Sequence, residues 1–412
     1  MNENVIKAAL LGFGTVGTGV YKVLKNQEKE MSAKIGCKVE IKKILVRNIE
    51  KAAAKIEDAS LLTSQWDEII NDPEIEIVIE LMGGINPAKE YILSALKAGK
   101  HVVSANKDLI AVHGHELLDA AHESKVDFLF EAAVAGGIPI IRPLKQCLAG
   151  NHMTEVMGIV NGTTNFILTK MTQEGMEFKD ALALATELGY AEADPTADIE
   201  GLDAGRKVAI MASIAFHSRV VFADVYTEGI TKITPEDMEY AREMGRSIKL
   251  LGTSKKLGDD SFYALVAPFL VGQENPLYSV NGVFNSIFVH GNMLGDAMFY
   301  GSGAGKLPTA SAVAADVVEA AKHLHDTIPN NWSNEEMTLM EPDSVEGRFF
   351  VRVKDTSLDE VDKAFGKVEA VIEPDSLPEE FGFITRLMTQ GEYKARVKAL
   401  GENVLGMIRV KD

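Results

Sequence analysis

One stretch of the chain, residues 185–207, combines carboxylates with a lysine in an order that suits proton transfer. Asp194 precedes a proline, and the residue before a proline is sterically excluded from the α region, so the chain there is expected to be extended or turned. A helix is predicted from Leu202 to Phe216, and it carries Asp203 and Lys207 four residues apart on one face. A lysine among apolar residues beside a carboxylate can move a proton. Taken alone, the same pair indicates only an intrahelical salt bridge.

A glycine motif near the beginning of the chain predicts a dinucleotide-binding unit. A buried strand pattern over residues 5–11 leads directly into the glycines, and a helix is predicted from residue 18 to about residue 27. Glycines at this place permit a tight turn and a close approach of a pyrophosphate, and the helix N-terminus supplies N–H groups. The residues expected to contact the cofactor are Gly12, Phe13, Gly14, Thr15, Val16 and Gly17.

The residue after the second predicted strand bears on the choice of cofactor. That strand covers residues 39–46 and is followed by Arg47. A site that prefers NAD usually has an acidic residue here, which binds the ribose 2′-OH, whereas a guanidinium suits a 2′-phosphate. The sequence therefore predicts a preference for NADP, with NAD possible. The alternative is that Arg47 merely lies at a strand end.

Strands and helices alternate from residue 5 to residue 131, which predicts an α/β fold with a doubly wound parallel sheet of the Rossmann type. Ligands of such sheets bind beyond the carboxyl ends of the strands. A glycine-rich loop at residues 301–305 either lies over the cofactor or forms an interdomain hinge, and the two are compatible. Further candidates for cofactor binding are Gly83, Ser104, Asn106, Lys107 and, in that loop, Gly303.

The order of the elements predicts three domains. Residues 1–135, joined by about 306–330, are expected to form the dinucleotide-binding domain. Residues 136–305 are expected to form an α+β domain for substrate binding and dimerisation. A polar linker then leads to residues 343–412, whose pattern predicts the order βαββαβ.

Composition excludes several classes of protein. The formal net charge of −18 argues against nonspecific binding of nucleic acid or of an anionic membrane surface. Two cysteines cannot build a disulfide framework, which is typical of a reducing compartment. The first seven residues are polar, and no apolar run reaches the length of a membrane span. We therefore expect a cytoplasmic protein whose substrate is a small molecule.

The motifs together resemble those of one family, homoserine dehydrogenase, from about residue 5 to about residue 325. The most specific match lies in the acidic stretch described first. Its matching residues are Ala185, Gly189, Tyr190, Asp194, Pro195, Asp198, Gly201, Asp203 and Lys207. The glycine motif at residues 12–17, SANK at 104–107, EAAVAGGIP at 131–139, NGTTN at 161–165 and GSGAGKLPTA at 301–310 are also similar to the family's versions.

The resemblance implies an enzyme that reversibly reduces L-aspartate 4-semialdehyde to L-homoserine with NAD(P)H, on the route to threonine and methionine. Hydride delivery to an aldehyde leaves an alkoxide that needs a proton and a nearby positive charge. The resemblance puts Lys207 and Lys107 beside the aldehyde, with Asp203 holding Lys207 or a bridging water. Which lysine transfers the proton is open. The remaining implied substrate contacts are Glu192 and Asp198 for the ammonium group, and Thr163 and Tyr190 as pocket lining.

The resemblance further implies a monovalent cation, sodium or potassium, that fixes the interdomain turn. Its ligands would be backbone carbonyl oxygens of Glu131, Val134, Gly136 and Ile138. The resemblance and the apolar strands of the middle domain favour a homodimer, with a homotetramer as the alternative.

Two rival functions remain to be excluded. A phosphorylating semialdehyde dehydrogenase needs an activated cysteine that forms a thioester, and neither Cys37 nor Cys147 lies in an activating context. A nucleotide-sensing regulatory protein could use the same fold, but it would not need the crowded carboxylates beside Lys207. The histidine pairs lack the companions of a zinc site.

The C-terminal order βαββαβ resembles an ACT domain, a small regulatory module. Such domains usually carry a glycine before the first helix, where this chain has Asp355-Thr-Ser-Leu358. The missing glycine removes the usual close backbone approach for an amino-acid effector. A dimerising or vestigial role is therefore at least as well supported as feedback regulation by threonine.

Overall fold

The computed structural model describes residues 5–258, 261–328 and 332–411 of the 412-residue chain. The chain forms two compact units. In the described parts of the chain, every helix is too short or too polar to traverse a lipid bilayer. The first unit comprises Met1–Gly150, Ile210–Val221 and Gly301–Glu336, and the second comprises Asn151–Ala209, Phe222–Tyr300 and Met337–Asp412.

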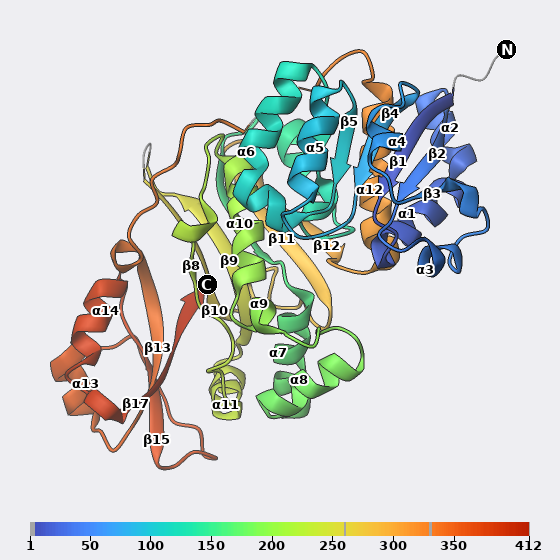
Figure 1. Cartoon of the computed structure of the whole chain (residues 1–412). Coiled ribbons are helices and arrows are strands. Elements are labelled where there is room, and N and C mark those ends of the chain that lie inside the picture. Colours follow the sequence, from blue (N-terminus) through green and yellow to red (C-terminus); the bar gives the residue numbers. More distant parts are fainter. Residues whose placement is uncertain (1–4, 259–260, 329–331, 412) are drawn as a thin grey trace. The chain divides into compact units, whose positions relative to one another are not determined.

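The first unit is built on a six-stranded parallel sheet in the order β3-β2-β1-β4-β5-β6 (Figure 1). This confirms the predicted doubly wound parallel sheet. The strand order reverses between β1 and β4, which is the place where such sheets bind dinucleotides. The strands are β1 (Val5–Leu11), β2 (Lys38–Leu45), β3 (Leu62–Thr63), β4 (Ile75–Glu80), β5 (His101–Ser104) and β6 (Phe128–Leu129).

Helices cover this sheet, and one of them returns from late in the sequence. The core joins Leu10 and Ile77 of the sheet to Val313 and Val317 of that helix, α12. A Cβ at Gly19 would lie 2.8 Å from the carbonyl oxygen of Lys306, so a glycine is needed where α1 and α12 pack. The helices are α1 (Thr15–Asn26), α2 (Glu28–Ile35), α3 (Ile49–Ala53), α4 (Asp67–Ile70), α5 (Ala88–Lys97), α6 (Lys107–Ser124) and α12 (Lys306–Lys322).

The second unit is built on a mixed 11-stranded sheet, whose main path is β12-β11-β7-β9-β10-β17-β13-β15-β14. Two short strands lie off this path, because β16 pairs with β13 and β8 pairs with β10. The strands of the middle segment are β7 (Met153–Ile159), β8 (Tyr226–Thr227), β9 (Ser247–Lys256), β10 (Phe262–Val271), β11 (Phe284–Gly291) and β12 (Gly295–Ser302). Sequence analysis did not identify β9, although it is central to this sheet.

Five helices of the middle segment accompany this sheet, and three of them carry candidate site residues. The first of these, α7, follows β7 directly, so its N-terminus lies at the end of a buried strand. The helices are α7 (Gly162–Glu174), α8 (Phe178–Glu187), α9 (Thr196–Ile199), α10 (Leu202–Ala215) and α11 (Pro235–Glu243).

The C-terminal segment has the predicted order βαββαβ, with the short extra strand β16 before its second helix. Asp355 takes a left-handed conformation, with φ of 46°, in the loop where the ACT pattern has a glycine. The elements are β13 (Glu346–Lys354), α13 (Leu358–Phe365), β14 (Ala370–Ile372), β15 (Glu380–Ile384), β16 (Met388–Thr389), α14 (Gln390–Val397) and β17 (Val404–Lys411).

The compact units differ from the predicted domains in two ways. Residues 343–412, expected to form a module of their own, continue the sheet of the middle segment, because β17 pairs in parallel with β10. The first unit extends to Gly150 and includes Ile210–Val221, which had been expected in the second domain. The difference arises because strand pairing between distant segments leaves no local signal in the sequence.

Candidate active site

The predicted lysine–carboxylate pair on α10 is present and largely buried. Lys207 Nζ donates to Asp203 Oδ2 at 2.6 Å and to the carbonyl oxygen of Val160 at 2.7 Å. The two side chains are only 12% and 7% exposed, respectively. An ion pair that is removed from water interacts more strongly than a surface pair. The intrahelical salt bridge and a functional role are therefore compatible, and the salt bridge holds the ammonium group in one position.

A residue that sequence analysis did not select, Asn161, joins the carboxylates of two helices. It lies between β7 and α7, where its Oδ1 accepts a hydrogen bond from the backbone N–H of Thr164 at 2.9 Å and caps α7. Its Nδ2 donates to Asp198 Oδ1 at 2.6 Å and to Asp203 Oδ2 at 2.9 Å. The sequence feature that could have identified Asn161 as a site residue is its position between a buried strand and a helix. Asn161 thus links Asp198 on α9 with the Asp203–Lys207 pair on α10.

The predicted pocket-lining residues Thr163 and Tyr190 also meet. The hydroxyl of Thr163 donates to the carbonyl oxygen of Tyr190 at 2.6 Å, so this hydroxyl fixes the backbone of the acidic stretch. The Tyr190 ring packs on Phe166 at 5.0 Å between centroids and remains 44% exposed. Glu192 is exposed, and its carboxylate forms no hydrogen bond or ion pair with another described residue. The structure therefore links Asp198 to Asp203 through Asn161 and pairs Thr163 with Tyr190, whereas Glu192 stands outside these contacts.

The loop after β10 is fastened to the start of α7 by buried polar groups. Asn165 Nδ2 donates to the carbonyl oxygens of Val280 at 3.3 Å, Gly282 at 3.0 Å and Phe284 at 3.1 Å. Lys249 Nζ also donates to the Val280 carbonyl oxygen, at 2.6 Å, and burial lowers the pKa of this lysine to about 8. These bonds assign both residues a structural role.

In the first unit, the glycine motif has the geometry of a phosphate cradle. Gly12 has a φ of 96°, and a Cβ at Gly17 would lie 2.2 Å from the Gly12 carbonyl oxygen. A Cβ at Gly14 would meet no protein atom within 4 Å, so the space before α1 is open. No side chain caps α1 at Gly14, which leaves its first N–H groups for a ligand. The predicted contacts Phe13, Thr15 and Val16 lie in the same turn.

A cavity of about 460 Å³ borders this cradle and carries positive charge. Gly14 and Thr15 form one part of its wall. Because the chain as a whole has a net charge of −18, a local group of lysines matters for holding an anion. The lysines that line the cavity are Lys22, Lys25, Lys55 and Lys306. Glu57 also lines it and pairs with Lys25 at 2.5 Å, so the lysines outnumber the carboxylates there.

At the ends of β4 and β5, the predicted cofactor residues form a buried network. Glu80 accepts hydrogen bonds from Ser104 Oγ at 2.7 Å and from the Met82 N–H at 2.7 Å, while burial raises the pKa of Glu80. Asn106 caps α6 and donates to the Gly84 carbonyl oxygen at 2.6 Å. Ser104 and Asn106 therefore shape the backbone around Gly83, and their contact with a cofactor stays a prediction.

Two predicted basic residues belong to the same edge of the sheet. Arg47 follows β2 and is exposed, and it forms no hydrogen bond or ion pair with another described residue. Its neighbour Asn48 caps α3 by accepting from the Lys51 N–H at 2.8 Å. Lys107 is the first residue of α6 and is half-buried. Because Lys107 and Lys207 belong to different units, the expected arrangement of both around one aldehyde stays a prediction.

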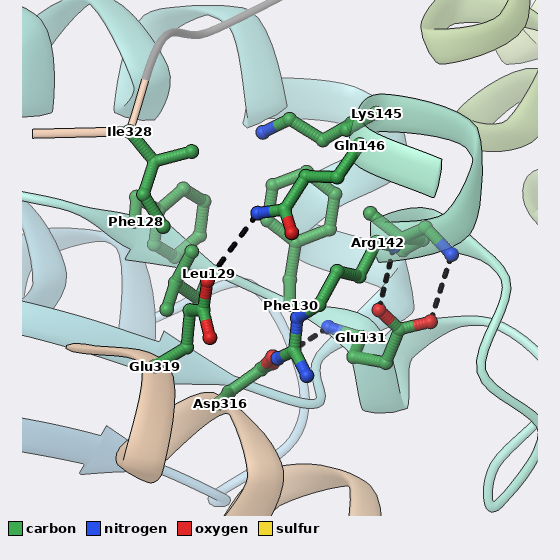
Figure 2. A pocket seen from close by; sticks show the side chains of 11 residues that line it. Phe128, Leu129, Phe130, Glu131, Arg142, Lys145, Gln146, Asp316, Glu319 and Ile328 are labelled. Carbon is green, nitrogen blue, oxygen red and sulfur yellow. Dashed lines mark hydrogen bonds and ion pairs between the residues drawn. The ribbon is translucent and has the colours of Figure 1, made fainter. Parts of the chain in front are cut away.

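Figure 2 shows that the carboxylate of Glu131, a predicted cation ligand, is engaged by backbone N–H groups. It accepts hydrogen bonds from the N–H groups of Ile140 at 2.5 Å, which the figure does not draw, of Ile141 at 2.7 Å and of Arg142 at 2.7 Å. Asp316 on α12 accepts from the Glu131 N–H at 2.7 Å and from Arg142 Nη2 at 2.7 Å. Burial, reinforced by the nearby Glu131, raises the pKa of Asp316 to about 7. The Glu131 carbonyl oxygen accepts a hydrogen bond from the Val134 N–H at 3.4 Å, and its second lone pair is the group suited to a cation.

The other predicted cation ligands lie in a tight, buried turn. Ala135 and Gly136 have φ values of 55° and 51°, and a Cβ at Gly136 would lie 2.5 Å from the Gly303 carbonyl oxygen. The turn that contains Val134, Gly136 and Ile138 therefore packs directly on the loop of Gly303. Within the described residues, no group of three or more His, Cys, Asp or Glu side chains could hold a metal ion. A backbone site remains compatible with this chain, because carbonyl oxygens can replace the hydration shell of a monovalent cation.

The cysteines do not favour thioester chemistry. Burial raises the pKa of the Cys37 thiol, which disfavours the nucleophilic thiolate. Cys147 is exposed, and neither cysteine forms a disulfide.

Comparison with known proteins agrees with these features. The family model of homoserine dehydrogenase matches residues 139–318, and that of the homoserine dehydrogenase NAD binding domain matches residues 12–131. The homoserine dehydrogenase of Bacillus subtilis (strain 168) is 42% identical over 351 residues, which cover 84% of this chain and 81% of that protein. The crystal structure of a homoserine dehydrogenase from Thiobacillus denitrificans has a TM-score of 0.93 and 36% identity, and the match covers 100% of this chain and 99% of that one. A hyperthermophilic archaeal homoserine dehydrogenase in complex with NADPH has a TM-score of 0.65 and 27% identity, with 77% and 98% covered.

Proposed function

The chain belongs to the homoserine dehydrogenase family, and from this premise we propose how its residues contribute to the reaction. The activity is the reversible NAD(P)H-dependent reduction of L-aspartate 4-semialdehyde to L-homoserine, a step toward threonine and methionine. The cofactor supplies the hydride. The protein has to bind the amino-acid substrate, orient its carbonyl group, and stabilise and protonate the alkoxide that hydride transfer leaves.

Lys207 stabilises and protonates that alkoxide, and Asp203 holds it for this purpose. An ammonium group has three N–H donors, and two of those of Lys207 bond Asp203 and Val160. The third is the donor for the substrate oxygen. The observation that carries this role is the desolvated Lys207–Asp203 pair, which places a positive charge where its interaction is strong. Lys107 is the second candidate for this role, as a cation or proton donor.

Asp198 and Glu192 bind the substrate ammonium group. Asn161 holds Asp198 beside Asp203, which concentrates negative charge next to Lys207. An amino acid then orients with its ammonium toward the carboxylates and its aldehyde toward the lysine. Thr163 and Tyr190 shape the pocket through the backbone contact between them.

The cofactor is NADP, with NAD as the weaker alternative. The pyrophosphate lies at the open cradle of Gly12, Gly14 and Gly17. The exposed guanidinium of Arg47 binds the 2′-phosphate. The archaeal relative forms a complex with NADPH, which supports this choice.

A sodium or potassium ion binds the carbonyl oxygens of Glu131, Val134, Gly136 and Ile138 and has a structural role. Two successive left-handed residues in this turn support a site made of backbone oxygens. An ion there stabilises the turn that packs on the loop of Gly303.

The enzyme assembles as a homodimer or homotetramer. β12 ends the order of the second sheet, and its alternate side chains are exposed, among them Met298 at 43% and Tyr300 at 53%. Phe284 of β11 stacks on Tyr300, so the exposed apolar surface continues across two strands. An apolar edge strand of this kind is usually covered by a partner.

Two further expectations stand on sequence and topology. The cytoplasm is the expected compartment. Residues 343–412 form an ACT-like module with a regulatory or dimerising role, which is supported by the strand order β17-β13-β15-β14.

The test of the proton-transfer role is replacement of Lys207 by methionine, which keeps most of the stem and removes the ammonium. The kcat for NADPH oxidation with the semialdehyde should fall by about 10²-fold or more, because general acid catalysis contributes about that much. The NADPH dissociation constant should stay within about twofold of wild type. Lys170→Met is the matched control, because Lys170 forms an i,i+4 pair with Glu174 on α7 and is not a site residue. Near-normal kcat in Lys207→Met would remove Lys207 from the mechanism.

A further inference from the structure

A short segment of the second unit, residues 226–230, lies between the substrate carboxylates and the C-terminal strand β17. β8 begins the segment and pairs in parallel with β10 at Leu265 and Val266. The Glu228 N–H continues this pairing by donating to the Val266 carbonyl oxygen at 2.8 Å. Residues 226–230, called here the brace, therefore have a defined backbone position against the sheet.

The brace contacts α9 through its backbone, directly beside Asp198. The Ile230 N–H donates to the carbonyl oxygen of Ile199, the last residue of α9, at 2.8 Å. A Cβ at Gly229 would lie 2.1 Å from that same oxygen and 2.6 Å from the Cα of Glu200. The two backbones are thus in contact with no room for a side chain. Any shift of the brace has to move the residue that follows Asp198.

The brace also contacts α10, which carries Asp203 and Lys207. A Cβ at Gly205 would lie 2.9 Å from the Thr227 side chain. Both helices of the lysine–carboxylate group therefore rest on residues 226–230. Asn161 joins the two helices from the other direction.

On its other side, the brace is held by one arginine of the C-terminal segment. Arg409 Nη1 donates to Glu228 Oε2 at 2.7 Å, and Arg409 Nη2 donates to Gln390 Oε1 at 2.6 Å. The guanidinium lies over the Tyr226 ring at 5.3 Å, and the Tyr226 hydroxyl donates to Glu228 Oε2 at 3.3 Å. The Arg409 side chain is only 7% exposed. A buried guanidinium that loses its carboxylate leaves an uncompensated charge, so this contact fixes the brace strongly.

We propose that Arg409 and Glu228 are positioning residues for the amino-acid substrate, which fix Asp198 through the backbone contact between the brace and α9. The C-terminal segment is then part of the apparatus that sets substrate affinity, even though it is remote in sequence from the site. This inference rests on the proposed role of Asp198 in binding the substrate ammonium. If this inference is right, breaking the Arg409–Glu228 ion pair specifically lowers the affinity for the amino-acid substrate.

The chain offers a matched control in a second buried arginine of the same segment. Arg352 on β13 donates to Asp237 Oδ1 at 2.7 Å and pairs with Glu380 at 3.1 Å, and its side chain is 6% exposed. Asp237 belongs to the capping box of α11. That helix contacts α7 at Thr172, in the last turn of α7, away from the end that begins beside Asn161. Arg352 Nη1 also donates to Thr234 Oγ1 at 2.9 Å, four residues beyond the brace, so Arg352 resembles Arg409 in burial and pairing while these bonds go to residues outside 226–230.

The experiment compares steady-state kinetics and melting temperatures of Arg409→Met, Glu228→Gln, their double variant, Arg409→Lys and Arg352→Met. Arg409→Met and Glu228→Gln should each raise the KM for homoserine by about fivefold or more. Their KM for NADP should remain within about twofold of wild type, and their kcat should change less than the homoserine KM, because the backbone hydrogen bond from the brace goes to α9, beside Asp198. The double variant should be no worse than the more impaired single variant, because both remove one interaction. Arg409→Lys should restore much of the affinity, and Arg352→Met should lower the melting temperature without changing the homoserine KM.

Two results would overturn the inference. The first is an unchanged homoserine KM in both Arg409→Met and Glu228→Gln, and the second is an equal rise in Arg352→Met, which would mean that general destabilisation is responsible. The variant Asp198→Asn, measured in the same experiment, separates the positioning role from the proposed role of Asp198 in binding the substrate ammonium. A raised KM in Asp198→Asn with normal Arg409 and Glu228 variants refutes only the positioning role. An unchanged KM in Asp198→Asn refutes the ammonium site and the positioning role together.

Discussion

Asn161 offers the sharpest test of the site, because one side chain both caps α7 and binds two carboxylates. Replacement by serine keeps an N-cap oxygen, since serine and asparagine are similarly good caps, but removes the amide that donates to Asp198 and Asp203. Replacement by aspartate also keeps the cap, and it adds a third carboxylate to the group. The two variants therefore separate the loss of the donor from the addition of charge.

The structure gives the size of the expected effect. Hydrogen bonds to charged groups contribute about 1.5–3 kcal/mol each. Losing two of them therefore removes at least about 3 kcal/mol of the free energy that holds Asp198 and Asp203 in position. At about 1.4 kcal/mol per factor of ten, kcat/KM for homoserine should fall about 100-fold in Asn161→Ser. Asn161→Asp should fall further at neutral pH because of like-charge repulsion, and it should recover partly as the pH is lowered and the introduced carboxyl is protonated.

The assay is NADPH formation from homoserine over a pH series, with the melting temperature of each variant as the control for folding. Both variants should still unfold in one cooperative transition, because the cap is retained, but they should melt a few degrees below wild type, because two hydrogen bonds to carboxylates are lost. If Asn161→Ser kept kcat/KM within about threefold of wild type, the reasoning that Asn161 organises the carboxylates would be wrong. Identical pH profiles for the two variants would refute the claim that the added carboxylate of Asn161→Asp lowers activity by like-charge repulsion.

Four substitutions in the first unit test its local chemistry. Arg47→Ala should raise the KM for NADP by about tenfold while leaving that for NAD nearly unchanged, and unchanged selectivity would contradict the 2′-phosphate assignment. Gly14→Ala should melt normally yet weaken NADPH binding in a fluorescence titration by about tenfold or more, whereas Gly17→Ala should lower the melting temperature, since its Cβ would lie 2.2 Å from a carbonyl oxygen. Burial raises the pKa of Asp316 from 3.8 to about 7, so its stabilising contribution is present below about pH 4 and is lost as the pH rises to 7. The melting temperature of Asp316→Asn relative to wild type should therefore rise between pH 4 and pH 7, and a constant difference would refute the shift.

Much of the first unit could be predicted because its signals are local. The glycine motif and the alternation of short strands with helices are consequences of backbone conformation and of a repeating pattern, and both are readable within a few residues. They led to the parallel sheet and to the edge where Gly12, Arg47 and Lys107 lie. The Asp203–Lys207 pair was predictable for the same reason, since helical geometry puts residues four apart on one face.

The parts that sequence analysis missed depend on contacts between distant segments. Asn161 meets Asp198 and Asp203 across 37 and 42 residues of chain, so no local pattern marks it as their partner. Glu131 was expected as a carbonyl ligand, and only the structure shows its carboxylate bound to the N–H groups of residues 140–142.

By itself, the sequence determined the dinucleotide-binding sheet and the family, and it singled out the lysine and carboxylates proposed to carry the chemistry, because each follows from local geometry or from a motif. Tertiary structure decided how these residues are held. It joined β17 to β10 and brought Arg409 to Glu228 across 181 residues, so that a segment expected to be a separate module supports the backbone beside Asp198. Strand pairing and buried ion pairs form wherever the folded chain brings complementary groups together, and separation along the sequence does not limit them.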